Sequence, residues 1–164
     1  MKNSNKVVLS IGANKGNVFS SAEICVNKLK EKIFDLKSSS YYYSEPVEDA
    51  NQDIFLNFAV SGKTDFSLDE FFLFIKNVEE YIGKEKERPK GPRKIDIDII
   101  FFNDLVLKRD DLQIPHKKAH KRLFVLKPIM EIEPYYCHPE LKKTVRDLYF
   151  ELQTDKKVWL AGKS

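Results

Sequence analysis

The sequence has little that would place the protein in a special compartment. It contains only two cysteines, Cys25 and Cys137, which lie far apart and belong to no paired motif. That usage favours a reducing compartment. No apolar run is long enough to cross a membrane, and the run at residues 7–13 is too short for a secretion signal. We therefore expect a cytoplasmic protein that does not enter a membrane.

An excess of charge of one sign is also missing. The 28 Lys and Arg residues nearly balance the 25 Asp and Glu residues, which leaves a net charge of +3. This value is too small to indicate a nucleic-acid partner. Repeats and low-complexity tracts are absent as well, and 164 residues with 42% hydrophobic content can form a proper core. The composition predicts a single compact domain over residues 1–164.

The turn at residues 12–17 follows the first apolar run and contains residues that tolerate positive φ. A glycine-containing turn before a helix can cradle phosphate. This one lacks the spacing of a P-loop and of a dinucleotide-binding fingerprint. An ordinary turn is therefore the favoured interpretation.

The segment at residues 91–102 carries the strongest chemical signal. Read as a strand, it directs Asp96 and Asp98 to the same face. The other face then carries Ile95, Ile97, Ile99 and Phe101. Two neighbouring carboxylates repel, so one keeps its proton or a cation lies between them. Mg²⁺ suits such ligands together with substrate phosphates, and Arg93 adds a planar donor for phosphate. A solvated strand face is the alternative, which the apolar residues after Asp98 disfavour.

The remaining periodicity outlines the fold. It predicts strands at 7–11, 36–43, 54–60 and 95–102, and helices at 19–33, 67–83 and 144–152. A hairpin turn is expected at Asn103 and Asp104, and the tail at 156–164 has no informative pattern. The order is that of a split β-α-β arrangement. We expect a ferredoxin-like α+β fold, with an antiparallel sheet of about four core strands plus a hairpin and helices on its faces.

Three polar features have more than one interpretation. The polar segment at 44–53 is either a mobile lid or a connector. Asn57 lies in an apolar run, where it caps a neighbouring loop or hydrogen-bonds the edge of a ligand. His116 and His120 have the spacing of a helical zinc pair, but Pro115 precedes the first and no glutamate completes the hydrolase motif. Both histidines fit better into a cationic cluster for phosphates with Lys117, Lys118, Lys121 and Arg122.

Taken in order, these motifs resemble the 6-hydroxymethyl-7,8-dihydropterin pyrophosphokinase family of folate biosynthesis. The resemblance extends from residue 7 to about residue 148 and rests on segments 11–17, 43–46, 52–57, 79–83, 91–98, 114–116 and 122–126. It implies a ferredoxin-like sheet and an enzyme that transfers diphosphate from ATP to the pterin hydroxymethyl group, giving AMP. No single segment is decisive, but the ordered set is specific.

The resemblance also implies roles for individual residues. Asp96 and Asp98 match the ligands of two Mg²⁺ ions, and Lys84 and Arg93 join them as catalytic residues. The ATP-binding positions are Glu79, Lys84, Lys86, Arg93, Ile99, His116, Lys117 and Arg122. The pterin-binding positions are Ser44, Pro46, Val47, Phe55, Asn57, Asp96 and Phe124, with the two phenylalanines sandwiching the ring.

Several positions depart from the family pattern. Lys84 stands where arginine is usual, Lys90 stands where an aromatic residue is usual, and Lys117 stands where proline or tyrosine is frequent. Two other functions stay open: a Mg²⁺-dependent phosphodiesterase or nucleotidyltransferase that uses the Asp96–Asp98 pair, and a non-enzymatic RNA-binding ferredoxin-like module whose strand aromatics stack on bases. The favoured interpretation implies a monomer that binds two small substrates and works beside dihydropteroate synthase.

Overall fold

The computed structural model describes residues 4–14, 17–45, 55–84 and 95–162, without the side chain of Lys84. The helices are α1 (Val18–Leu29), α2 (Leu68–Lys84), the 3₁₀ turn η1 (Ala119–Lys121), α3 (Leu123–Ile132) and α4 (Val145–Glu151). The strands are β1 (Asn5–Ala13), β2 (Phe34–Ser38), β3 (Tyr41–Ser44), β4 (Phe55–Thr64), β5 (Asp96–Phe102), β6 (Leu107–Lys108), β7 (Gln113–Ile114), β8 (Cys137–His138), β9 (Lys143–Thr144) and β10 (Val158–Gly162).

Six strands form one antiparallel sheet in the order β10-β3-β4-β1-β5, with β2 also paired to β4. The central strand β1 pairs with β4 on one side and with β5 on the other. The chain therefore follows the β-α-β-β-α-β order of ferredoxin-like folds. This confirms the fold class that the sequence predicts. The sheet has six strands, whereas the prediction was about four core strands plus a hairpin.

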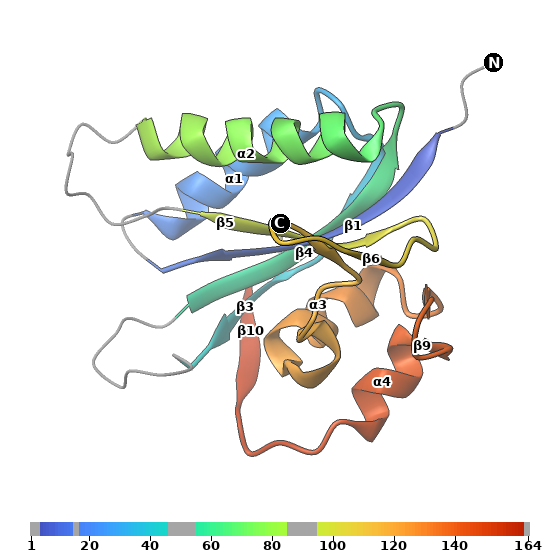
Figure 1. Cartoon of the computed structure of the whole chain (residues 1–164). Helices are drawn as coiled ribbons and strands as arrows, with labels where there is room; N and C mark the ends of the chain where they lie inside the picture. The colour runs from blue at the N-terminus through green and yellow to red at the C-terminus, as the bar shows by residue number, and fades with distance from the viewer. Residues whose placement is uncertain (1–3, 15–16, 46–54, 85–94, 163–164) are drawn as a thin grey trace.

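Helices cover both faces of the sheet, as Figure 1 shows. Helices α1 and α2 lie on one face, over a core that includes Leu9, Phe58 and Ile97. Helices α3 and α4 lie on the other face, where Val8 and Phe101 pack against them. Among the described residues, no helix is both long and apolar enough to cross a membrane.

The helix starts form where the sequence supplies capping residues. Ser67 and Glu70 bond each other's backbone amides at the start of α2, at 3.3 and 2.9 Å, as the predicted capping box requires. Asn17 accepts the amide hydrogen of Ser20 ahead of α1. Thr144 and Asp147 form a second capping box at α4. These local signals fix the helix starts close to their predicted positions.

A β-bulge in β5 corrects one prediction. Leu9 pairs with Ile99, whereas Val8 pairs with Phe101, so Ile100 is an extra residue opposite β1. The bulge reverses the alternation after Ile99. Phe101 therefore packs under α3 and α4, and not with Ile97 and Ile99 as predicted. Asp96 and Asp98 precede the bulge and keep the shared face that the sequence indicates.

Two other predictions about strands were wrong in detail, and one strand was not predicted. The strand expected at 36–43 is interrupted after Ser38, because Glu131 of α3 accepts hydrogen bonds from the backbone and hydroxyl of Ser40. The turn at Asn103 exists, but the strand after it, β6, pairs with β7 and forms no hairpin with β5. The uninformative tail contains β10, which pairs with β3.

Candidate active site

The strand ends that carry the predicted site meet at one end of the sheet. Gly12 of β1 pairs with Asn57 of β4 on one side and with Asp96 of β5 on the other. Ser44 of β3 pairs with Phe55 of β4. Since side chains alternate along a strand, the polar groups of Ser44, Asn57, Asp96 and Asp98 lie on the face that α3 and α4 cover farther along. The sheet thus brings together residues from three separate predicted motifs.

Asn57 is fixed at the centre of this face. Its side chain is only 3% exposed, and its amide Nδ2 donates a hydrogen bond to Ser44 Oγ. Its Oδ1 lies over Gly12, where an added Cβ would stand 3.4 Å away. A methyl group at position 12 would therefore stand in van der Waals contact with the amide. Asn57 Nδ2 also lies 3.5 Å from the backbone oxygen of Phe55 in the same strand, so both of these contacts hold the amide within the sheet.

Asp96 and Asp98 both lie exposed near the start of β5. Asp98 pairs with Ser10, and Asp96 pairs with Gly12, so only small residues of β1 stand beside the carboxylates. In the described part of the chain, no cluster of three or more His, Cys, Asp and Glu could hold a metal by itself. Two exposed carboxylates suit Mg²⁺, which takes one or two of them and completes its shell with water and phosphate oxygens.

His116 lies beside the carboxylate pair. Its backbone amide donates to Ile100 O, and its Nδ1 accepts the amide hydrogen of Lys118 at 3.3 Å. The Nε2 of its neutral form therefore carries the hydrogen, 4.0 Å from Asp98 Oδ2. Burial lowers the pKa of His116; Asp98 opposes this shift, whereas the charges of Arg122 and Lys118 add to it. His116 is placed as a neutral donor facing Asp98.

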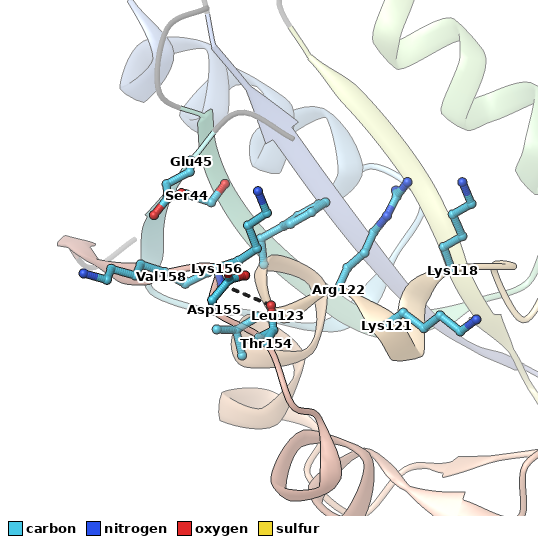
Figure 2. Close-up of a pocket in the computed structure, with 12 residues that line it drawn as sticks. Ser44, Glu45, Lys118, Lys121, Arg122, Leu123, Thr154, Asp155, Lys156 and Val158 are labelled. Atoms are coloured by element: carbon cyan, nitrogen blue, oxygen red, sulfur yellow. Dashed lines mark hydrogen bonds between the residues drawn. The ribbon is translucent and has the colours of Figure 1, made fainter. Parts of the chain in front are cut away.

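Arg122 and Phe124 begin α3 at the border of the open face. Arg122 is the residue before the helix and has extended backbone, and its guanidinium lies 5.6 Å from the Phe124 ring centre. Both residues line a cavity of about 370 Å³, which also contacts Ser44. Figure 2 shows this cavity between the end of β3, the start of α3 and the segment from Thr154 to Val158.

A second cavity, of about 320 Å³, lies beside β5 and is lined by Asp98, Ile99, His116 and Lys117. Because the side chain of Ile99 packs into the core, β5 can offer a ligand little more than its backbone at this position. Glu79 of α2 accepts the amide hydrogen of Ile97 at 2.7 Å. The structure thus places four predicted nucleotide-site residues around one strand.

A family comparison assigns the chain. The family model described as 7,8-dihydro-6-hydroxymethylpterin-pyrophosphokinase matches residues 8–134. The chain belongs to this family. A pyrophosphokinase of Aquifex aeolicus, 2-amino-4-hydroxy-6-hydroxymethyldihydropteridine pyrophosphokinase, is 37% identical over 86% of the chain and 88% of its own length. The protein of the same name from Helicobacter pylori is 36% identical over 77% of the chain and 80% of its own length.

Other relatives of this pyrophosphokinase chain are longer proteins. The folic acid synthesis protein FOL1 of Dictyostelium discoideum is 37% identical, but the chain spans only 22% of it and is itself covered to 90%. The solved structure of wild-type Plasmodium falciparum HPPK-DHPS has a TM-score of 0.73 at 18% identity, over 92% of this chain and 45% of that one. That likeness supports the fold alone.

Several residues predicted for the pyrophosphokinase site cannot be placed. Pro46, Val47, Lys86 and Arg93 lie outside the described residues, and Lys84 is described only as the last residue of α2. Lys90, the other unusual position, also lies outside them. The roles that the family pattern implies for these residues therefore stay predictions.

The predicted phosphate cluster needs one correction in this pyrophosphokinase. His120 turns inward, where its ring lies 6.1 Å from that of His138 and its buried Nδ1 has no hydrogen-bond partner. Burial lowers the pKa of His120, with a further contribution from Lys121, so the ring is neutral near pH 7. It adds no charge to the cluster, which keeps its lysines and Arg122.

Sequence reasoning missed the contribution of the C-terminal segment. Lys156 and Lys157 line the same cavity as Phe124, because β10 adds to the sheet beside β3. A strand of five residues without clear alternation gives no local signal for that position. Its pairing with β3 could not be read from spacing.

Proposed function

We propose that this chain transfers a diphosphate group from ATP to the hydroxymethyl group of 6-hydroxymethyl-7,8-dihydropterin in folate biosynthesis. The observation that carries the proposal is the shared sheet face: the Asn57–Ser44 pair and the Asp96–Asp98 pair lie on either side of Gly12. One pair can recognise a heterocycle edge while the other holds a cation beside its reacting group. The family's reaction needs both.

The acceptor side uses flat and polar groups. We propose that Phe55 and Phe124 stack on the pterin and that Asn57 hydrogen-bonds its edge, with Ser44, Pro46 and Val47 near that edge. Stacking supplies affinity for any flat ring. Asn57 supplies specificity, because a ring without matching groups would leave a buried amide unpaired.

The nucleotide side uses the cavity beside β5. We propose that Ile99, His116 and Lys117 line the ATP site, with Arg122 contacting phosphate. Lys84, Lys86 and Arg93 are proposed as further cations of this site on the strength of the family pattern. The neutral Nε2–H of His116 can donate to a phosphate oxygen, and Arg122 can donate through two nitrogens.

The metal site is proposed at the carboxylate pair. Asp96 and Asp98 have the ligand type and exposure that fit Mg²⁺, and the family pattern implies two ions held together with the triphosphate. Bound there, Mg²⁺ would neutralise charge on the transferring group and the departing AMP. Asp96 is also proposed to face the pterin.

The chain's own residues then act mainly by orientation. The hydroxymethyl oxygen forms a bond to the β-phosphorus, the bond from that phosphorus to the α,β-bridging oxygen breaks, and AMP leaves with the electron pair. The hydroxyl proton is released. Asn57 and the two phenylalanines hold the acceptor, while His116 and Arg122 hold the phosphates, so that the reacting atoms meet in line.

The other two candidate functions are not favoured. A phosphodiesterase or nucleotidyltransferase would use the same carboxylates, but family membership points to diphosphate transfer. An RNA-binding module would need neither carboxylate. We keep a cytoplasmic monomer, one domain over residues 1–164 and action beside dihydropteroate synthase as proposals. The longer Plasmodium falciparum protein HPPK-DHPS is consistent with the last of these.

A product analysis tests the function. Purified protein is incubated with ATP and Mg²⁺, with and without 6-hydroxymethyl-7,8-dihydropterin, and the nucleotides are separated. We expect AMP, and not ADP, in amounts that depend on the pterin. Formation of ADP, or nucleotide release indifferent to the pterin, would show that the substrate or the reaction has been assigned wrongly.

A further inference from the structure

Glu79 is almost buried and bonds the backbone of the strand that carries Asp96 and Asp98. Its side chain is 10% exposed, and its Oε2 accepts the amide hydrogen of Ile97 at 2.7 Å. Its Oε1 lies 3.3 Å from Lys76 Nζ on the same helix. The carboxylate also contributes to the raised pKa of the buried Cys25 thiol, after burial itself, which places it close to α1. Glu79 is therefore held between two helices and the sheet.

The amide that donates to Glu79 belongs to β5, the edge strand of the described sheet. Strand β5 pairs with β1 on one side only, so the amides on its other side need partners from outside the sheet. Ile97 is the residue between Asp96 and Asp98. A charge-assisted bond at this amide fixes the backbone from which both carboxylates project.

The same hydrogen bond connects helix α2 to strand β5. Glu79 lies near the end of α2, whereas Ile97 lies at the start of β5, and 18 positions separate them in sequence. In the sequence, Lys84 follows Glu79, and Arg93, Asp96 and Asp98 lie close to Ile97. The bond adds to the apolar packing that holds α2 against the strand with the proposed metal ligands.

We propose that Glu79 is a positioning residue that acts through the backbone of Ile97, and not a group that contacts the phosphates of ATP. A carboxylate facing a triphosphate would be repelled by it, whereas a carboxylate bonded to an amide is stabilised. Both of its oxygens have partners from the chain. This inference rests on the proposed function for its kinetic consequence, but the bond itself can be tested without turnover.

Two substitutions separate the roles. Glu79→Gln keeps an oxygen that can accept the Ile97 amide hydrogen but removes the charge, whereas Glu79→Leu removes both. We expect Glu79→Leu to lower kcat and to raise the Mg²⁺ concentration for half-maximal rate by about 10- to 100-fold, as changes beside metal ligands do. The KM for pterin should stay unchanged. Glu79→Gln should recover most of that loss.

Amide hydrogen exchange at Ile97, measured by NMR without metal or substrates, reports the bond directly. We expect exchange at Ile97 to be faster in Glu79→Leu and close to parental in Glu79→Gln, with the β1 amides as an internal reference. Val78→Ala controls for lost stability, because it truncates a core residue on the same helix that is 3% exposed. This variant should unfold at a lower temperature. Its turnover and its Ile97 exchange rate, relative to the β1 amides, should stay close to those of the parent.

Three results would overturn the inference. If Glu79→Gln loses as much turnover as Glu79→Leu, the charge matters and Glu79 contacts nucleotide or metal. If Ile97 exchange is unaffected by Glu79→Leu, the bond does not constrain β5. If Glu79→Leu slows turnover no more than Val78→Ala does, the effect is one of stability. A parent protein that forms no pterin-dependent AMP would instead refute the proposed function and leave the exchange result interpretable.

Discussion

At the scale of single residues, the proposed site depends on side chains held by the sheet. Asn57 is buried and bonded to Ser44, whereas Asp96 and Asp98 are exposed on the same face. We expect Asn57 to discriminate between ligands, because a buried and bonded side chain cannot move to suit a wrong one. We expect the two exposed carboxylates to bind a cation together with phosphates.

Replacing a carboxylate tests the metal proposal. We expect Asp96→Asn and Asp98→Asn each to lower kcat by at least about 100-fold, because each removes a charged ligand. Both side chains are exposed, so the free energy of unfolding should change by no more than about 0.5 kcal/mol. Steady-state kinetics and urea denaturation measure the two effects. The exposed Asp104, at the other end of β5, gives the control Asp104→Asn; near-parental turnover in either site variant would contradict the proposal.

Truncating Asn57 tests pterin recognition. Asn57→Ala should raise the KM for pterin by about 10- to 100-fold, since a lost buried hydrogen bond costs about 1–3 kcal/mol. The KM for ATP should not change. Ser61→Ala is the matched control, because it removes a buried side-chain hydrogen bond of the same strand, to Glu133, away from the site. A pterin KM that moves equally in both variants would mean that Asn57 acts through stability.

At the scale of elements, close packing between strands and turns decides where side chains can stand. Strand β4 pairs with β3 and β2 along one edge. Glu131 of α3 accepts hydrogen bonds from Ser40 and Tyr42, and Glu133, just after α3, accepts one from Ser61. The helix thereby ties the interrupted edge to the centre of the sheet. At the same edge, the chain that enters β2 leaves little space at Gly62 of β4.

Replacing Gly62 and Gly83 by alanine should change the free energy of unfolding in opposite directions. A Cβ on Gly62 would lie 2.4 Å from Ile33 Cγ2 and 2.7 Å from the backbone oxygen of Phe34. Gly62→Ala should lower the free energy of unfolding by about 1–3 kcal/mol, because backbone must shift. Gly83→Ala in α2 meets nothing within 4 Å and should raise it by about 0.5–1 kcal/mol. Urea denaturation decides; equal midpoints for the two variants would show that β4 accommodates the methyl group.

At the scale of the whole molecule, buried histidines link stability to pH. Burial lowers the pKa of His138 and of His120 from the ordinary 6.5, and each faces Glu140, which opposes the shift. Neighbouring positive charge adds to it, from Lys121 at His120 and from His120 at His138. As the pH falls, the unfolded chain therefore binds protons at a higher pH than the folded chain does.

The sign of the effect follows from this order of protonation. Stability from the two histidines is fully present above pH 6.5 and is lost as the pH falls below that value toward the folded pKa values. His120→Phe removes one titrating ring whose Nδ1 is buried without a partner, so its unfolding midpoint should fall less between pH 7.5 and pH 5.5 than that of the parent. Thermal unfolding at both pH values measures this. A parallel decline in the two proteins would exclude His120 as a source.

Sequence patterns give much of this molecule because their physical causes are local. Alternation places Asp96 and Asp98 on one face, and the capping box of Ser67 and Glu70 starts a helix, whatever the rest of the chain does. The ferredoxin-like order follows from the succession of these elements. The motif order also identifies the family, which the comparisons confirm.

Tertiary structure alone decides what depends on pairing between distant segments. The bulge at Ile100 sends Phe101 to the second core because β1 and β5 must both fit their helices, and no local pattern encodes an extra residue. Burial against His138 makes His120 neutral, although its lysine neighbours suggest a cation. The β10 pairing and the Glu79–Ile97 bond likewise join segments far apart in sequence. The sequence determined which groups the site contains, and packing determined which of them are held, charged and facing one another.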